Sequence, residues 1–290
     1  MRAAYPDTEG LVLRNGVQLG YEVYGEGEPT ILLLPTWTII HSRFWKMQVA
    51  YLARHHRVIT YDGPGNGRSQ RVTDSERYSP TAHAEDAVAV LDECGAGRVV
   101  AIGLSLGAAY GSMLALRHPE RVVGLVMIGP SMPLTPPSSE RALVRENFDA
   151  PLVEDAQGWA RYNRAYWHHD YDGFTQFFFS ECFNETHSTK PIEDSVGWAS
   201  GAGPEILAAE ADAPAPTIDE WRELLPSIDC PVLVIQGTHD VISPHARGVE
   251  AAILTDGELL TIQGSGHIPN VRDPVQVNLA IRRFVEEVAS

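Results

Sequence analysis

Short runs of consecutive apolar residues recur along the chain and are separated by segments with helical spacing. The runs lie at residues 31–34, 57–61, 98–104, 121–129, 230–237 and 258–263. Their apolar residues are continuous rather than alternating, which is typical of strands buried on both faces. Such strands interleaved with helices predict an α/β fold, in which a mostly parallel, twisted sheet is covered by helices on both sides.

Two further extended segments come before these runs, around residues 11–13 and 17–24. Between them stands Arg14-Asn15-Gly16, and an Asn-Gly pair between extended segments favours a tight hairpin turn. The sequence therefore predicts an antiparallel hairpin at the start of the sheet.

The alternation of strands and helices breaks between residues 131 and 226. This stretch has clustered prolines at both ends, many aromatic residues and no clear strand. We interpret it as a helical cap subdomain, 131–226, inserted into a core domain made of residues 1–130 and 227–290. A chain of 290 residues with 44% hydrophobic residues fits one large domain with such an insert.

The composition of the chain limits which binding partners and which cellular compartment are expected. The formal net charge is −16, which argues against binding to nucleic acid or to anionic membranes. The N-terminal segment lacks the pattern of a secretory signal, and no apolar run approaches transmembrane length. Cys94, Cys182 and Cys230 are widely spaced and odd in number, so they fit neither a disulfide framework nor a zinc site. We expect a cytoplasmic protein with free thiols, and a homodimer is compatible with the sequence.

A Gly-x-Ser-x-Gly motif, Gly103-Leu104-Ser105-Leu106-Gly107, stands between a predicted strand and a helix rich in small residues. That setting is the one in which a sharp turn exposes a nucleophilic serine, because small residues two positions before and after it let the backbone fold tightly. Ser105 is therefore the candidate nucleophile, and the backbone N–H of Leu106 is a candidate donor to an oxyanion.

An activated serine needs a general base, and the base needs a carboxylate that orients it. Asp240 follows the predicted strand 230–237, and His267 follows the predicted strand 258–263. Ligands of open parallel sheets bind at the carboxyl ends of the strands, where all three candidates lie. The order serine, acid, histidine predicts a triad of Ser105, Asp240 and His267.

The chain resembles the α/β-hydrolase family in nearly all of its length outside the insert. The resemblance is carried by GLSLG, VIQGTHD, GSGHIPNVRDP and VITYDGPGNGRS. It implies the α/β-hydrolase fold, with Ser105 as nucleophile, His267 as general base and acid, Asp240 as its orienting carboxylate, and the insert as the cap. Some relatives place the acid after the strand that ends near Gly129, but the stretch GPSMPLTPP offers no carboxylate there.

The chain departs from this family in the loop after residues 31–34. Relatives usually have a His-Gly pair there, and this chain has Pro35-Thr36 followed by Trp37. Proline lacks an N–H but leaves the N–H of Trp37 available, whereas threonine disfavours the positive φ that glycine allows. We expect the N–H groups of Trp37 and Leu106 to form the oxyanion hole, and the indole of Trp37 to form a wall of the substrate pocket. His41, on the same loop, is a further candidate for substrate contact.

Two other patterns favour no site. The glycines of DGPGNGRS do not match a dinucleotide or Walker motif, so a tight turn explains them better. The run WHHDYD has adjacent histidines that point in different directions on a helix, without a spaced partner for a metal. We predict neither a metal nor a cofactor.

These patterns favour a serine hydrolase that cleaves a carboxylic ester or lactone of a small to medium apolar substrate through an acyl-enzyme. The alternatives are an acyltransferase that uses the same acyl-enzyme, a hydrolase of carbon–carbon, thioester or amide bonds, and a non-catalytic ligand-binding member. Transfer to an added acceptor distinguishes the first, and labelling of Ser105 by a fluorophosphonate argues against the last.

Overall fold

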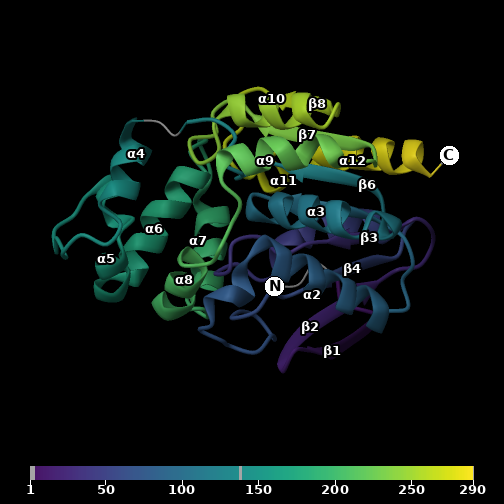
Figure 1. The fold of residues 1–290 in the computed structure, drawn as a ribbon, viewed down its shortest axis with the longest axis horizontal. Coiled ribbons are helices and arrows are strands. Elements are labelled where there is room, and N and C mark those ends of the chain that lie inside the picture. The colour runs from purple at the N-terminus through teal and green to yellow at the C-terminus, as the bar shows by residue number, and fades with distance from the viewer. Residues whose placement is uncertain (1–3, 137–138, 290) are drawn as a thin grey trace.

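An eight-stranded sheet runs through the computed structural model, which describes residues 4–136 and 139–289 (Figure 1). The strand order is β1-β2-β4-β3-β5-β6-β7-β8, and the pairs from β4 to β8 are all parallel. The mostly parallel sheet predicted from the apolar runs is thus confirmed. The parallel strands are β3 (Thr30–Leu33), β4 (Val58–Tyr61), β5 (Val99–Leu104), β6 (Val122–Ile128), β7 (Val232–Gly237) and β8 (Glu258–Ile262).

The predicted hairpin forms the antiparallel edge of this sheet. β1 (Thr8–Arg14) pairs with β2 (Val17–Tyr24), and β2 pairs antiparallel with β4. In the turn, Asn15 and Gly16 have φ of 47° and 80°. Two consecutive left-handed residues are what a two-residue hairpin turn of the favoured twist requires.

Helices cover both faces of the sheet. Side chains alternate along each strand, so Ile31 and Leu33 of β3 pack on one face and Leu32 on the other. The first face is covered by α1 (Lys46–Leu52) and α12 (Pro274–Val288). The second is covered by α2 (Pro80–Glu93), α3 (Leu106–Arg117) and α10 (His245–Leu254). The continuous apolar runs follow from this double coverage.

The segment between β6 and β7 contains helices joined by loops and no strand in its described part, and five of its helices gather at one end of the sheet, at the left of Figure 1. They are α4 (Ser139–Glu146), α5 (Arg164–His169), α6 (Tyr171–Cys182), α7 (Thr189–Ala199) and α8 (Pro204–Ala211). Buried aromatic side chains such as Trp167 and Phe174 fill the space among them.

The last helix of the segment is placed differently. α9 (Ile218–Leu224) packs its buried Trp221 into the core on the side of α2 and α3. The proposed subdomain 131–226 therefore contains one helix that belongs to the packing of the sheet.

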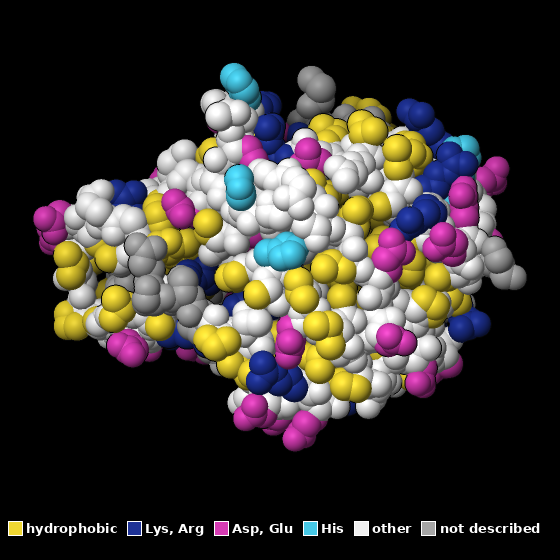
Figure 2. All heavy atoms as spheres, turned by 90° about the horizontal axis from the view of Figure 1, so that it is seen from above, with side chains coloured by type: hydrophobic (Ala, Val, Ile, Leu, Met, Phe, Trp, Pro, Cys, Tyr) yellow, Lys and Arg dark blue, Asp and Glu magenta, His cyan; other side chains and the backbone are white. Residues whose placement is uncertain are grey.

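On the outside, the face seen in Figure 2 carries acidic and basic side chains that are interspersed. No helix within residues 4–136 and 139–289 is both long and apolar enough to cross a membrane.

Candidate active site

Ser105 occupies a sharp turn between β5 and α3. Its φ of 57° and ψ of −117° lie in a region that side-chain-bearing residues rarely adopt. The turn depends on glycine at two flanking positions. A Cβ at Gly103 would overlap the carbonyl of Gly107, and a Cβ at Gly107 would overlap the carbonyl oxygen of Pro35. The sequence motif thus has a steric cause, and backbone strain of this kind is typical of functional residues.

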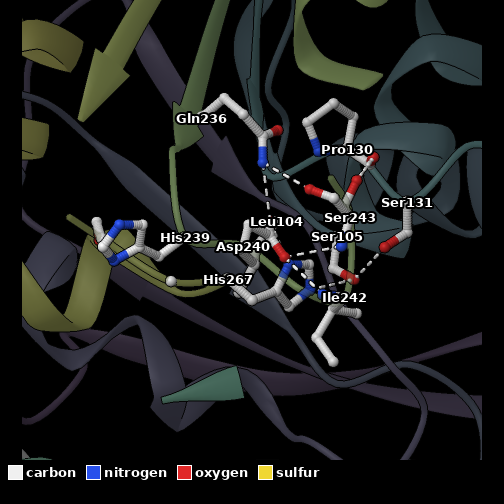
Figure 3. Close-up of polar contacts among 12 residues, drawn as sticks. Leu104, Ser105, Pro130, Ser131, Gln236, His239, Asp240, Ile242, Ser243 and His267 are labelled. Carbon is white, nitrogen blue, oxygen red and sulfur yellow. Dashed lines mark hydrogen bonds and ion pairs between the residues drawn. The ribbon is translucent and has the colours of Figure 1, made fainter. Parts of the chain in front are cut away.

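The structure brings Ser105, His267 and Asp240 together at the carboxyl-terminal edge of the sheet (Figure 3). Asp240 follows β7, and His267 lies between β8 and the short helix α11 (Pro269–Arg272). Ser105 Oγ lies 3.0 Å from His267 Nε2, and His267 Nδ1 lies 2.8 Å from Asp240 Oδ2. The exposed fractions of the three residues are 9%, 3% and 5%, so little water competes for these contacts.

The carboxylate of Asp240 is held on both oxygens. Oδ1 accepts hydrogen bonds from the backbone N–H groups of Ile242 and Ser243 at 2.9 and 2.7 Å. Oδ2 accepts a hydrogen bond from Gln236 Nε2 at 2.9 Å, in addition to its contact with His267. These donors fix the carboxylate, so that one oxygen faces the imidazole and fixes the orientation of the ring.

Two other residues beside this arrangement were not predicted. The exposed His239 precedes Asp240, and its ring points away from Ser105 in Figure 3. Ser131 follows β6, and its Oγ lies 2.8 Å from Ser105 Oγ. Sequence spacing hints at Ser131, since it stands near the position where some relatives carry the triad acid.

The loop after β3 accepts threonine without strain. Among the residues that the structure describes, positive φ occurs outside glycine only at Asn15, Ser105, His187 and Asp256. Thr36 is therefore not forced into the conformation that disfavours it. Its buried hydroxyl donates a hydrogen bond of 2.9 Å to the carbonyl oxygen of Leu104, at the end of β5. Glycine could not make this bond, so the threonine ties the loop to the residue before Ser105.

Further contacts hold the same loop at Thr38. Asn66 Nδ2 donates to the Thr38 carbonyl at 2.7 Å, and the Thr38 hydroxyl donates to the carbonyl oxygen of Pro64 at 3.2 Å. The glycine-rich turn after β4 thus braces the loop. Between these anchors, the backbone N–H of Trp37 donates to no other residue in the described ranges, and the same holds for Leu106 at the start of α3.

A buried acid joins this loop to the inserted helices. Glu210 of α8 accepts hydrogen bonds from the N–H of Thr38 at 3.3 Å and from the Tyr110 hydroxyl at 3.2 Å. Burial raises the pKa of Glu210 to about 8, although both hydrogen bonds oppose the shift. Tyr110 in turn stacks on His83, whose pKa burial lowers to about 3. The Glu210 carboxyl and the His83 imidazole are therefore uncharged near neutral pH.

A cavity of about 240 Å³ opens at Ser105 and His267. Trp37 belongs to its lining, and the Trp37 ring centroid lies 4.3 Å from that of Phe178. His41 does not belong to the lining; its ring lies 5.7 Å from Trp198, which does. The aromatic residues of the lining are Trp37, Phe44, Tyr162, Phe178, Phe179, Phe183 and Trp198.

A cluster of three or more His, Cys, Asp or Glu side chains arranged to hold a metal ion is not found within residues 4–136 and 139–289. His168 and His169 end α5 on the surface of the insert.

Comparisons with known proteins agree with the observed fold. A family model described as "alpha/beta hydrolase fold" matches residues 29–274. RutD of Variovorax paradoxus, a candidate carbamate hydrolase, is 29% identical over 275 residues, which cover 94% of this chain and 97% of that protein. The 3-oxoadipate enol-lactonase 2 of Acinetobacter baylyi is 26% identical over 276 residues, covering 93% and 94%. The solved structure of Est816, an N-acyl homoserine lactone degrading enzyme, aligns with a TM-score of 0.77 and 26% identity, over 95% of this chain and 100% of that chain.

Proposed function

Because this chain belongs to the alpha/beta hydrolase fold family, we propose that it is a serine hydrolase that cleaves carboxylic esters or lactones. The observation that carries the proposal is the continuous set of contacts from Ser105 Oγ through His267 to Asp240. A serine, an imidazole and a carboxylate in this order supply a nucleophile, a base and the group that orients the base.

The proposed reaction begins when Ser105 Oγ attacks the substrate carbonyl carbon and His267 Nε2 takes the hydroxyl proton. Asp240 keeps the Nδ1 proton of His267 in place and stabilises the imidazolium that forms. His267 then gives the proton to the leaving oxygen, which departs and leaves an acyl group on Ser105. In the second half, His267 deprotonates a water that attacks the acyl carbon. The bond from the acyl carbon to Ser105 Oγ then breaks, His267 returns the proton to Oγ, and the free acid is released.

We assign the oxyanion hole to the backbone N–H groups of Trp37 and Leu106. Neither N–H donates to another described residue, and Leu106 stands at the N-terminus of α3, where the helix dipole favours negative charge. The bond from Thr36 to Leu104 ties the two donor-bearing segments together. Fixed donors of this kind stabilise the charge that develops on the carbonyl oxygen.

The ester or lactone class is supported by the relatives and by the cavity. The enol-lactonase and the acyl homoserine lactone degrading enzyme act on lactones, and both align with nearly the whole chain. The cavity of about 240 Å³ has mainly aromatic and aliphatic walls, which suit a small to medium acyl group with apolar parts.

Esterase and lactonase assays with purified protein and with Ser105→Ala test the proposal. We expect the protein to hydrolyse nitrophenyl esters or γ-lactones, and the variant to lose about 10⁴-fold or more of kcat/KM. A fluorophosphonate probe should label the protein on Ser105 and fail to label the variant. Full activity in Ser105→Ala, or labelling at another residue, would contradict the proposed nucleophile.

A further inference from the structure

Arginine side chains form part of the wall of the cavity that contains Ser105. Arg141 and Arg145 come from α4, and Arg247 comes from the first turns of α10. These helices are far apart in the sequence, so the fold brings the three cations to one chamber. The proposed hydrolysis of an apolar ester makes no use of them.

Arg247 is the most informative of the three because it is buried. Its exposed fraction is 7%, and its Nε is shielded from solvent without a hydrogen-bond partner. Among the side chains that the structure describes, no carboxylate lies at ion-pair distance from its guanidinium. A buried cation without a partner is costly, and a ligand that supplies a negative charge would remove that cost.

The acidic residue of the lining, Asp194, and the nearby Asp240 are engaged elsewhere. Both oxygens of Asp240 already accept hydrogen bonds, and Asp194 pairs with Lys46 at 2.6 Å and with Lys190. Burial lowers the pKa of Arg247 to about 10, repulsion from Arg141 adds to the shift, and Asp240 opposes it. Arg247 is therefore still a cation at neutral pH, and its charge is unbalanced at short range.

The cationic wall contrasts with the charge of the protein as a whole. The chain carries a net charge of −16, and acidic and basic side chains are interspersed on the face that Figure 2 shows. Arg141 is further fixed by its guanidinium, which lies 4.5 Å from the ring centroid of Trp159. Positive charge is thus concentrated in the chamber while the protein as a whole is acidic.

We propose that Arg247, with Arg141 and Arg145, binds a carboxylate group of the substrate, so that the preferred substrates are esters or lactones that carry a free carboxylate. The proposal rests on the proposed hydrolase function and names its substrate class. A carboxylate has two coplanar oxygens that match the planar fork of a guanidinium. The aromatic walls then contact the apolar chain between the carboxylate and the ester carbonyl.

Matched pairs of esters test the proposal and locate the carboxylate. Nitrophenyl hemiglutarate against nitrophenyl valerate places the charge on the acyl side. The butyrate ester of 4-hydroxybenzoate against phenyl butyrate places it on the leaving group. We expect kcat/KM to favour the charged member of one pair by about 30-fold, as for a charge-assisted hydrogen bond formed in a dry site.

Arg247→Gln should reduce kcat/KM for the preferred charged ester by about 30-fold and change that of its uncharged partner by less than about threefold. Arg54→Gln is the matched control, since Arg54 is exposed and lies outside the cavity lining. A thermal unfolding midpoint of Arg247→Gln equal to or above that of the parent would show that folding is preserved. Arg145→Gln, at an exposed position, provides a second variant in the same wall.

Equal kcat/KM for both members of each pair would overturn the proposal. An equal loss of activity toward the charged and the uncharged ester in Arg247→Gln would also overturn it. That result would mean that Arg247 acts through Asp240 instead of binding the substrate carboxylate. Hydrolysis of the uncharged esters that depends on Ser105 would leave the proposed function intact in either case. Absence of all Ser105-dependent hydrolysis would instead contradict the proposed function itself.

Discussion

The cavity is bordered by two regions that are stabilised in different ways. In the first, at the ends of β5, β7 and β8, the functional side chains Ser105, His267 and Asp240 contact one another directly. In the second, the loop of residues 35–38, the backbone is held by groups from elsewhere, including Leu104 and Glu210.

This difference separates the side chains proposed to react, which lie in the first region, from the backbone loop that borders them, which is the second region. The first region needs only the strand order and two short loops, because parallel strands end at one edge of the sheet. The second region, the loop after β3, is held only when three separate groups contact it. These groups are the inserted helix α8, the glycine-rich turn after β4 and the end of β5, which accepts the hydrogen bond from the Thr36 hydroxyl. We therefore expect changes in the first region to abolish turnover, and changes in the second to alter rate, stability or selectivity by degrees.

Asp240→Asn gives the largest of the effects that test this comparison. An amide nitrogen at the position of Oδ2 would face two donors, Gln236 Nε2 and His267 Nδ1–H, and would favour the wrong tautomer of His267. We expect kcat/KM for an ester to fall by about 10⁴-fold, as for the corresponding change in a serine protease triad. Steady-state kinetics at saturating and limiting substrate measure this.

Asp194→Asn is the control for that experiment, because Asp194 lines the same cavity and pairs with Lys46 without contacting His267. A loss below about tenfold is expected there. If Asp240→Asn and Asp194→Asn lowered kcat/KM by similar factors, the effect would come from loss of negative charge near the cavity and not from the contact of Asp240 with His267. The distinction between the two regions would then fail.

Glu210→Gln tests the second region through the dependence of stability on pH. The carboxyl ionises near its ordinary value of 4.5 in the unfolded chain but near 8 in the folded protein. Between these values the folded state binds more protons, so the stability of the parent protein falls as pH rises through this window. Glutamine cannot ionise, so the variant should gain about 3 kcal/mol relative to the parent between pH 5 and 8.

Denaturant unfolding at several pH values measures that difference. Glu205→Gln is the matched control, an exposed acid on the same helix, and should show no such trend. A constant difference between Glu210→Gln and the parent from pH 5 to pH 8 would mean that Glu210 is ionised in the folded protein, and that the loop is held by a charge.

The first region, at the ends of β5, β7 and β8, was largely predictable from the sequence, because short sequence patterns determine its strands and the turn at Ser105. Each apolar run marks a strand that the structure confirms, and the candidate residues lie in the short segments that follow these strands. The turn at Ser105 requires glycine at Gly103 and Gly107 for steric reasons, so the motif itself encodes the geometry. The catalytic role of the three residues remains a proposal that the variants above test.

The second region was not predictable, because its contacts join residues far apart in the chain. Thr36 and Leu104 are 68 positions apart, and Thr38 and Glu210 are 172 apart. The hydrophobic periodicity of the sequence does not predict which face of α8 or α10 contacts the cavity or its loops, because the packing of the whole molecule sets the orientation of these helices. For the same reason the sequence predicted an apolar pocket without Arg247. It also placed α9 within the insert, and Trp221 of α9 belongs to the same hydrophobic core as residues of α2 and α3.

Thr36→Val tests a single anchor of the second region with a smaller expected effect. Valine has nearly the shape of threonine but cannot donate, so the buried carbonyl oxygen of Leu104 would lose this bond. We expect the free energy of unfolding to fall by about 1–2 kcal/mol and kcat to fall by about tenfold, because the Trp37 donor is less well fixed. Denaturant titration and steady-state kinetics measure the two quantities.

Thr60→Val provides the matched control for that change. Thr60 is equally buried, on β4, but its hydroxyl has no hydrogen-bond partner within the described residues. The same substitution there should leave stability unchanged or raise it, since no bond is lost. If Thr36→Val behaved like Thr60→Val in both measurements, the loop would be held by its backbone contacts alone.

The smallest expected effect concerns Ser131, which lies after β6 and contacts Ser105 directly. For His267 to act as base, Ser105 must donate its proton to Nε2, and its Oγ can then accept a hydrogen bond from Ser131 Oγ at 2.8 Å. That donor would stabilise the charge that develops on the nucleophile. We expect Ser131→Ala to lower kcat/KM about fivefold, about 1 kcal/mol, and Ser195→Ala, another serine of the cavity lining, to have little effect. A rise in kcat for Ser131→Ala would show the opposite polarity, in which Ser105 donates to Ser131 in the resting protein and must first be released. In that case the geometry of the first region would itself limit the rate, and the two regions would share control of turnover.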